Sequence, residues 1–213
     1  MDSLHEGGAK FLFPYLAVND KKQLAKGLYE CLNKAFGGFS LSAVEGAVQA
    51  GHKAYEDWMA DVRAEGAKAL AYARQNGKRI MVLAGRPYHV DSGICQGMDQ
   101  LIESLGFVIV SEDCVSNLVT PQKVNVLNQW VYHARLYNAA KYVGLHDDCQ
   151  LVQLVSFGCG LDAITTDEVR AILERYGKLY TQIKVDEINN LGAAKIRLRS
   201  LVGALEEREA KWN

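Results

Sequence analysis

The feature that most constrains the fold is a repeated alternation of short apolar runs with amphipathic stretches after residue 78. The apolar runs are RIMVLAG, FVIVSED, LVQLVS and KLYTQIKV, at residues 79–85, 107–113, 151–156 and 178–185. Strands that alternate with helices across short links form parallel sheets covered by helices on both faces. We therefore predict an α/β domain over residues 78–213, a three-layer flavodoxin-like or Rossmann-like parallel sheet of about four strands.

The helices of this domain are placed by apolar spacing and by capping residues. Apolar residues at helical spacing predict a helix over residues 94–105. Thr120 and Pro121 have the character of an N-cap and first-turn proline, which predicts a helix from there to about Val143. Thr165 and Glu168 form a capping box before another helix, and a last helix follows residue 190.

Residues 1–77 have a different texture, and we interpret them as an N-terminal helical arm. Helical spacing covers residues 21–36, and GGFS at residues 37–40 interrupts it. Ser42 and Glu45 form a capping box that predicts a second helix to Arg74, roughly 45 Å long if it is continuous. Glycines at positions 46, 51 and 66 are candidate breaks in that helix.

Composition excludes several classes of partner. The net charge is −1 and hydrophobic residues make up 49% of the chain, so neither nucleic acid nor an anionic membrane is an expected partner. No apolar run is long enough to cross a bilayer, and the N-terminus lacks a secretory signal. We therefore expect a cytoplasmic protein, in which the five cysteines are free thiols or ligands rather than disulfides.

Polar and glycine-rich segments follow each predicted strand, at the sheet edge where ligands bind in such folds. These segments are GRPYHVDSG, SEDC, SFGCG and DEINN. The guanidinium of Arg86 suits a carboxylate or phosphate, and His89 could donate a proton or bind a ligand; an ordinary turn made by Pro87 with Tyr88 packed against it is the alternative. The candidate binding residues are Arg86, Tyr88, His89, Ser156, Gly158, Gly160, Asp186, Glu187 and Asn190.

Cys159 is the candidate metal ligand, because it lies between two glycines at the start of a predicted helix. Glycine allows a sharp turn and a close approach, and a helix N-terminus favours the thiolate. The alternative is a tight turn with a passive cysteine. Cys95 and Cys114 fall near the same edge and could join Cys159 around a [4Fe-4S] cluster; we prefer a core position for Cys95 and an incidental one for Cys114.

Cations at the start of the last helix are the other unusual feature. Lys195, Arg197 and Arg199 lie where the helix dipole disfavours positive charge, which a nearby anion would offset. A solvated helix face is the alternative. Asp186 and Glu187 are either a general acid and base or partners of these cations. His133 is interpreted as a packing residue.

Three long motifs, VLAGRPYHVD, QLVSFGCGLDAITTDEV and KVDEINNLGAAKIRLRSL, resemble the activase-related proteins of the 2-hydroxyacyl-CoA dehydratase system. The opening FLFPYL and the long helix before GRPYH are also similar. The resemblance implies an iron–sulfur system, in which the dehydratase carries a cysteine-ligated [4Fe-4S] cluster and an ATP-hydrolysing activator supplies one electron. The shared cysteine of the family falls on Cys159, whereas Cys95, Cys114 and Cys149 fall where the family pattern does not require one.

The resembling proteins are much longer, so we expect this chain to be one lobe of such a system. Its expected partners are a second dehydratase-like lobe and an activator ATPase domain or subunit, or a second copy of the chain in a homodimer. The expected function is to contribute Cys159 to an iron–sulfur redox centre completed elsewhere. The alternative is a non-catalytic module that docks a CoA ester or a partner protein.

Overall fold

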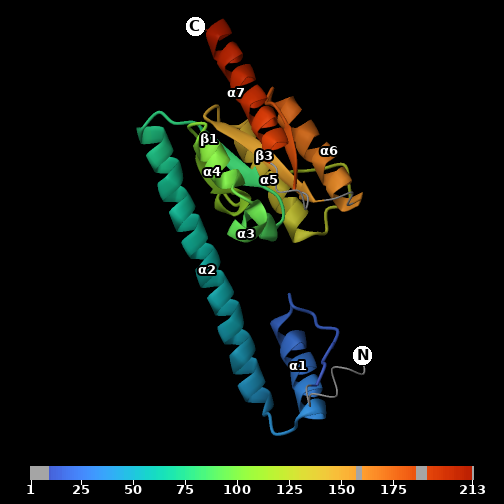
Figure 1. Cartoon of the computed structure of the whole chain (residues 1–213). Coiled ribbons are helices and arrows are strands. Elements are labelled where there is room, and N and C mark those ends of the chain that lie inside the picture. Colours follow the sequence, from blue (N-terminus) through green and yellow to red (C-terminus); the bar gives the residue numbers. More distant parts are fainter. Residues whose placement is uncertain (1–9, 157–159, 186–190, 213) are drawn as a thin grey trace. The chain divides into compact units, whose positions relative to one another are not determined.

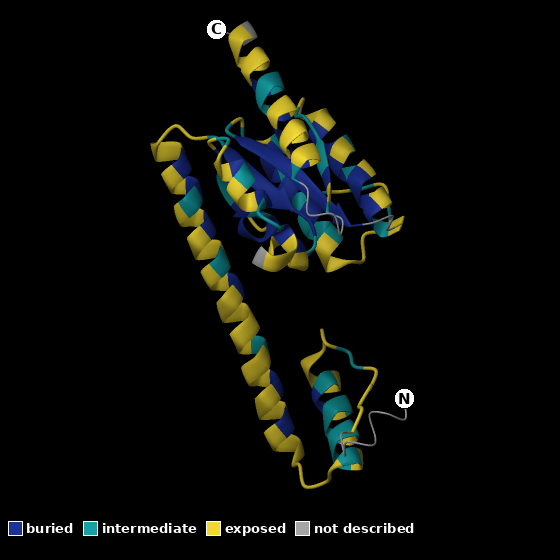
Figure 2. Cartoon of the chain, in the orientation of Figure 1, coloured by how far each residue is buried: buried dark blue, intermediate teal, exposed yellow. Residues whose placement is uncertain are grey.

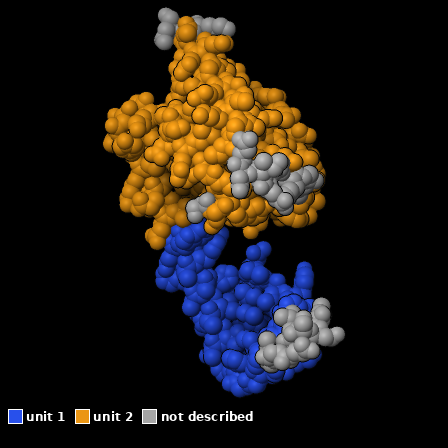
Figure 3. Space-filling view, in the orientation of Figure 1, with its two compact units in different colours: residues 1–60 blue, residues 61–213 orange. Residues whose placement is uncertain are grey.

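The computed structural model describes residues 10–156, 160–185 and 191–212. Contacts divide the chain into two compact units, Met1–Ala60 and Asp61–Asn213 (Figure 3). The sequence predicts a domain boundary between residues 77 and 78, which is later in the chain than the boundary between these two units at residues 60 and 61. That boundary stays a prediction, and each unit is described by itself.

The first unit contains helix α1 (Lys21–Ala35) and the first part of helix α2 (Leu41–Gln75). Asp20 caps α1, because its carboxylate accepts hydrogen bonds from the backbone N–H groups of Lys22 and Gln23, both at 3.0 Å. A small core of Ala25, Val44 and Val48 joins the two helices. The aromatic side chains of the FLFPYL segment, residues 11–16, do not belong to this core; Phe13 and Tyr15, for example, are exposed.

Helix α2 is continuous over 35 residues, about 52 Å, and none of its glycines breaks it. It begins two residues earlier than the sequence predicts, so the assignment of Ser42 and Glu45 as its capping box is wrong. The hydroxyl of Ser40 accepts the N–H of Ala43 at 3.1 Å and caps the helix instead. The two left-handed glycines at 37 and 38 make the turn between α1 and α2, and Ser40 follows them after Phe39.

The second unit is built on a four-stranded parallel sheet with the order β2-β1-β3-β4, which confirms the predicted fold class. The strands are β1 (Ile80–Ala84), β2 (Val108–Ser111), β3 (Cys149–Ser156) and β4 (Thr181–Val185). The central strands β1 and β3 are buried along their whole length, which explains why both sequences are nearly continuous apolar runs (Figure 2).

Helices cover both faces of the sheet, and alternate residues of β1 point into two separate hydrophobic clusters. On one face, Ile80 and Val82 meet the end of α2, helix α5 (Val131–Gly144) and helix α6 (Gly160–Arg175). On the other face, Met81 and Leu83 meet α3 (Ser92–Cys95), α4 (Met98–Glu103) and α7 (Gly192–Trp212). Helices α4 and α7 lie in front of the sheet in Figure 1.

Two further helix starts differ from the sequence prediction, because the folded chain uses the expected capping residues in another way. Helix α5 begins at Val131 rather than at Thr120. Thr120 accepts hydrogen bonds from Lys141 of α5, and the backbone N–H of Gln122 donates to the side chain of Asn138 at 2.8 Å. These bonds hold residues 120–122 against the side of α5 instead of at its start.

Helix α6 begins at Gly160, so the predicted capping box at Thr165 and Glu168 is also wrong. Thr165 lies inside the helix, where its hydroxyl donates to the carbonyl of Leu161 at 2.8 Å. The predicted helix over residues 94–105 is divided into α3 and α4, because Gln96 and Gly97 are both left-handed. None of the helices in the described part of the chain combines the length and the apolarity needed to span a bilayer.

The replacement Gly66→Ala tests the packing of α2 on the sheet unit. A Cβ at this position would lie 2.4 Å from Cβ and 2.6 Å from Sγ of Cys114, so a shift is unavoidable. Overpacking of this kind costs about 1–3 kcal/mol, against a helix-propensity gain of about 1 kcal/mol. We expect a lower urea midpoint for Gly66→Ala, whereas Gly51→Ala, which meets no atom within 4 Å, should raise it. Equal shifts in the same direction would contradict this packing.

Candidate functional site

The candidate site lies where the carboxyl ends of β1 and β3 meet. From β1 the chain crosses to β2 on one side, and from β3 it crosses to β4 on the other side, so the strand order reverses between them. Ligand sites of open parallel sheets form in the crevice at such a reversal. The chain leaves β1 through Gly85 and the short 3-10 helix η2 (Pro87–Val90), and it leaves β3 at Ser156.

His89 is the buried centre of this junction, with 1% of its surface exposed. The backbone N–H of Arg86 donates to Nδ1 of His89 at 3.0 Å. The proton of the neutral ring is therefore on Nε2, which donates to the hydroxyl of Ser156 at 2.5 Å. This chain of bonds ties the turn after β1 to the last residue of β3.

The absence of a side chain at Gly85 makes room for His89. A Cβ at Gly85 would lie 2.5 Å from Nδ1 of His89 and 3.1 Å from the carbonyl oxygen of Leu154. The backbone of β3 cannot move aside without breaking its pairing with β1. The glycine in GRPYH is therefore required by the packing of the imidazole against the neighbouring strand.

Asp162 joins the same network from the first turn of α6. Its Oδ1 accepts from Nη2 of Arg86 at 2.9 Å and from Nε at 3.3 Å, and its Oδ2 accepts the backbone N–H of Ser156 at 3.3 Å. The side chain of Asp162 is mostly buried and that of Arg86 is partly exposed. Asp162 therefore links the turn after β1, the end of β3 and the start of α6.

The protonation of His89 bears on what this network can do chemically. Burial lowers the pKa of His89 below its ordinary value, the charge of Arg86 lowers it further, and the carboxylate of Asp162 opposes both. The neutral ring donates from Nε2, so it is not arranged to accept the hydroxyl proton of Ser156 as a serine-activating base would. The hydroxyl of Ser156 instead has Tyr88 as a neighbour, at 3.2 Å between the two oxygens.

His133 belongs to the same surroundings, which the sequence interpretation as a packing residue did not foresee. Burial lowers its pKa; the charge of Arg86 lowers it and that of Asp162 raises it, so the three side chains share one electrostatic environment. Its ring stacks on the indole of Trp130, with the centroids 5.5 Å apart. Helix α5 thus brings a second imidazole to this edge of the sheet.

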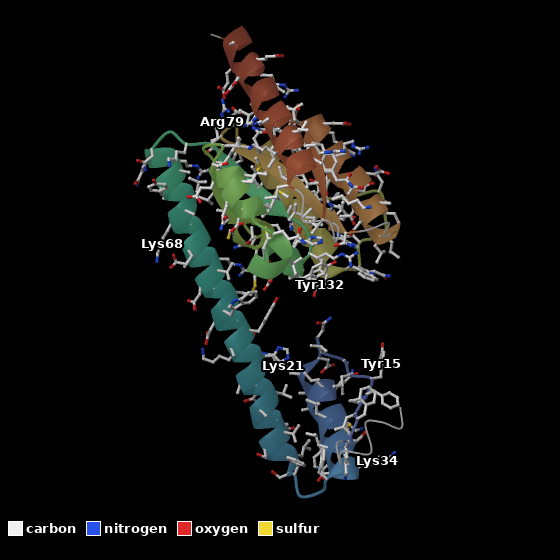
Figure 4. The ribbon with its side chains drawn as sticks, viewed as in Figure 1. Tyr15, Lys21, Lys34, Lys68, Arg79 and Tyr132 are labelled. Carbon is white, nitrogen blue, oxygen red and sulfur yellow. The ribbon has the colours of Figure 1, made fainter. Side chains whose placement is uncertain are left out.

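Exposed aromatic and aliphatic side chains lie around this network. Trp130, Val131 and Tyr132 at the start of α5 are exposed, as is Tyr88. Figure 4 shows Tyr132 at one end of the second unit and Arg79, which precedes β1, at the other end. Tyr88, whose hydroxyl lies 3.2 Å from that of Ser156, and Trp130, whose indole stacks on His133, therefore lie next to the network; together with Val131 and Tyr132, we call these four exposed side chains the aromatic rim.

A buried carboxyl lies in the 3-10 helix η3 (Glu112–Cys114), directly after β2. Glu112 is 2% exposed, and burial together with the neighbouring Asp113 raises its pKa to about 8; Arg135 opposes the shift. Asp113 forms an ion pair with Arg135 of α5. Nε and Nη2 of Arg135 are buried without a hydrogen-bond partner. Glu112 is therefore held as a neutral acid near pH 7.

The described cysteines do not converge on a metal site. Cys95 and Cys114 are buried in the clusters on opposite faces of the sheet, so they cannot meet. Cys149 begins β3, roughly 23 Å along the strand from Ser156, and burial raises its pKa to about 12. Cys31 belongs to the first unit. Over residues 10–156, 160–185 and 191–212, no group of three metal-binding side chains occurs, so the described residues alone do not fit an iron–sulfur cluster.

The structure brings together four of the predicted binding residues, Arg86, Tyr88, His89 and Ser156, and Gly160 begins α6 beside them. The other predicted residues, Gly158, Cys159, Asp186, Glu187 and Asn190, lie outside the described residues. The sequence analysis did not identify Asp162. A signal was present: an acidic residue follows SFGCG, and GRPYH contains Arg86 as a possible basic partner for it.

The replacement Asp162→Asn tests the network. It removes the charge that faces Arg86 and weakens the acceptor for the N–H of Ser156, so we expect the free energy of unfolding to fall by about 2–4 kcal/mol. The control is Asp167→Asn on the same helix, where the carboxylate is exposed and lies 3.4 Å from Arg170; a loss below about 0.5 kcal/mol is expected. Equal losses in urea denaturation would show that the network contributes nothing special.

The raised pKa of Glu112 predicts a pH dependence of stability. Between about pH 4.5 and 8 the carboxyl is protonated in the folded chain and ionised in the unfolded chain, so folding takes up a proton. Stability should therefore fall as pH rises through that window, by up to about 1.4 kcal/mol per pH unit from this group. Urea titrations from pH 5 to 9 should show a flatter profile for Glu112→Gln but an unchanged one for the exposed control Glu103→Gln; parallel profiles for wild type and Glu112→Gln would contradict the assignment.

Comparison with known proteins identifies the family. A family model described as the CoA enzyme activase uncharacterised domain matches residues 1–115, which is 115 of the 213 residues and includes Arg86, Tyr88 and His89. No curated protein and no solved structure matches the chain. The match confirms the activase family that the sequence motifs predict. The chain therefore belongs to the family of the CoA enzyme activase uncharacterised domain.

Proposed function

We propose that this chain is a lobe of a CoA-substrate-specific enzyme activase or 2-hydroxyacyl-CoA dehydratase-like protein, and that it contributes Cys159 to an iron–sulfur redox centre completed by another domain or subunit. The observation that carries the proposal is the bonding of Asp162 to both Arg86 and Ser156. Ser156 ends β3 and Gly160 begins α6, so this network fixes both ends of the three-residue segment that contains the cysteine.

Fixed ends matter because contacts around a metal ligand orient it and tune its affinity for the metal. Ser156 is anchored through its hydroxyl by His89 and through its N–H by Asp162. Asp162 lies in the first turn of α6, a helix of 16 residues whose N-terminus favours a thiolate on a nearby cysteine. The chain's own residues therefore join Ser156 to the first turn of α6, the two described elements between which Cys159 lies in the sequence.

The positions of the other cysteines support the proposal that the centre is completed from outside the chain. Three of the described thiols are buried at separate places in the sheet unit, and Cys31 belongs to the first unit. A [4Fe-4S] cluster, when bound, would supply one-electron transfer, and its remaining ligands would come from a companion domain or subunit. The exposed aromatic rim offers an apolar surface beside the same edge for such a companion.

The alternative function is a module that docks a CoA ester or a partner protein without chemistry of its own. The exposed aromatic rim favours one form of this alternative, the docking of a partner protein, because exposed apolar surfaces commonly bind other proteins. For a CoA ester, the guanidinium of Arg86 is less open than the sequence alone indicated, because Nε and Nη2 already bind Asp162. A phosphate would have to compete with that carboxylate.

Iron loading of the assembled protein tests the proposal. The chain is co-produced anaerobically with the companion lobe and activator, and iron, sulfide and visible absorption of the purified complex are measured. We expect the wild-type complex to be brown and Cys159→Ser to lose most of its iron and sulfide, whereas the control Cys31→Ser keeps both. A complex that assembles with wild-type iron content in Cys159→Ser overturns the proposal. A complex that assembles but is colourless also overturns it and supports the docking alternative.

A further inference from the structure

We propose that the second unit has a separate binding site for an organic anion, a molecule with an apolar body and one carboxylate or phosphate group. The site is a cavity of about 520 Å³ between the α3–α4 turn, strand β4 and the start of α7. It does not involve Arg86, His89 or Ser156, and it does not rest on the proposed role of Cys159. The cavity, its lining and the position of one arginine carry the inference.

The inner wall of the cavity is apolar and preformed. Cys95, Met98, Ile183 and Ala194 line it and are all buried in the hydrophobic cluster on this face of the sheet. Burial raises the pKa of Cys95, so its thiol stays protonated and behaves as a small apolar group. Such a wall accepts hydrocarbon rather than an ion.

The rim of the cavity is polar and carries positive charge. Gln96, Gln182, Lys184 and Arg197 line it, and none of its described lining residues is acidic. Nη1 of Arg197 donates to the carbonyl oxygen of Gln182 at 3.1 Å, which holds the guanidinium beside β4 and leaves other N–H groups for a ligand. Within the described residues, Arg197 forms no ion pair with a carboxylate.

An anion in the cavity would also account for the unusual placement of Arg197. It lies in the second turn of α7, near the end of the helix where the dipole disfavours cations. A bound carboxylate or phosphate would face both the guanidinium and this end of the helix. Of the three cations that raised the question of a nearby anion, Arg197 is the one that lines the cavity.

The backbone beside the cavity is strained. Gln96 has φ 52° and ψ 35°, and it is the one non-glycine residue with positive φ in the described part of the chain. It separates Cys95 from Met98, and all three line the cavity. Strained backbone of this kind persists where the surrounding structure needs it, and it is common at ligand sites. Here it turns the chain sharply between α3 and α4 and so shapes the cavity wall.

The size of the cavity limits the ligand. Pockets for small organic molecules are typically about 300–1,000 Å³, so this cavity accepts a short acyl or aromatic body with its anionic group at the rim. A free inorganic anion would leave the apolar wall uncovered. Octanoate and octyl phosphate have the required combination, octanol lacks the charge, and inorganic phosphate lacks the apolar body.

Calorimetric titration of the full chain with octanoate and octyl phosphate tests the site. We expect at least one of the two to bind wild type, and octanol and inorganic phosphate to bind more weakly. Arg197→Gln should weaken binding about tenfold, the value of one charge-assisted contact, whereas Arg199→Gln, an exposed residue of the same helix outside the cavity, should not. Failure of both amphipathic anions to bind, or equal affinity for wild type and Arg197→Gln, would overturn the proposal.

Filling the cavity locates the binding and separates it from the iron centre. Ala193 lines the cavity and is exposed, so Ala193→Phe should fold normally and abolish octanoate binding; Ala210→Phe further along α7 is the matched control. Unchanged affinity in Ala193→Phe would overturn the location. Cys159→Ser should bind octanoate like wild type, so the anion site stands or falls independently of the iron–sulfur proposal; weaker binding in that variant would contradict the independence argued here.

Discussion

The parallel pairing of β1 with β3 is the constraint on which the rest of the second unit depends. Both strands are buried along their length, and their neighbours β2 and β4 lie on the outer sides. This order brings the turn after β1 against the end of β3, so His89 can reach Ser156 through the space that Gly85 leaves. A side chain at Gly85, or a one-residue shift in the pairing of β1 with β3, would move the turn after β1 away from the end of β3 and break the bond between His89 and Ser156.

The strands and layers could be predicted because their causes are local in the sequence. Short apolar runs without polar alternation indicate strands buried on both faces, and all four were found near the expected residues. Helix starts were harder, because Thr120 and Thr165 are good capping residues that the folded chain uses elsewhere. Lys141 binds Thr120 from a later helix, and the hydroxyl of Thr165 binds a carbonyl within its own helix. A contact between distant segments thus decided the first outcome, and a bond within α6 accompanies the second.

In the candidate site, too, the residues with a local sequence signal could be predicted, and those placed by contacts between distant segments could not. Arg86, Tyr88, His89 and Ser156 follow predicted strands, and a parallel sheet brings such residues to one edge. Asp162 and His133 lie inside helices, where an acid in the first turn or a histidine among aromatic residues has an ordinary structural explanation. Their nearness to Arg86 follows from the crossing of α5 and α6 over the sheet, which no local pattern encodes. The sequence therefore predicts the site residues that follow the strands, but not the two that helices α5 and α6 bring to them.

The described thiols of the second unit are dispersed through its core. Cysteines that bind one metal ion lie close together and ionise readily. Cys95 and Cys114 instead lie on opposite faces of the sheet, and burial raises the pKa of Cys95. Cys149, with a pKa of about 12, lies at the far end of β3. These three thiols serve as small core residues, which is consistent with the proposal that a cluster would use Cys159 and ligands from a companion. The network of Arg86, His89, Ser156 and Asp162, in contrast, joins the turn after β1, the end of β3 and the first turn of α6, so it holds this edge of the sheet together by polar bonds within the chain.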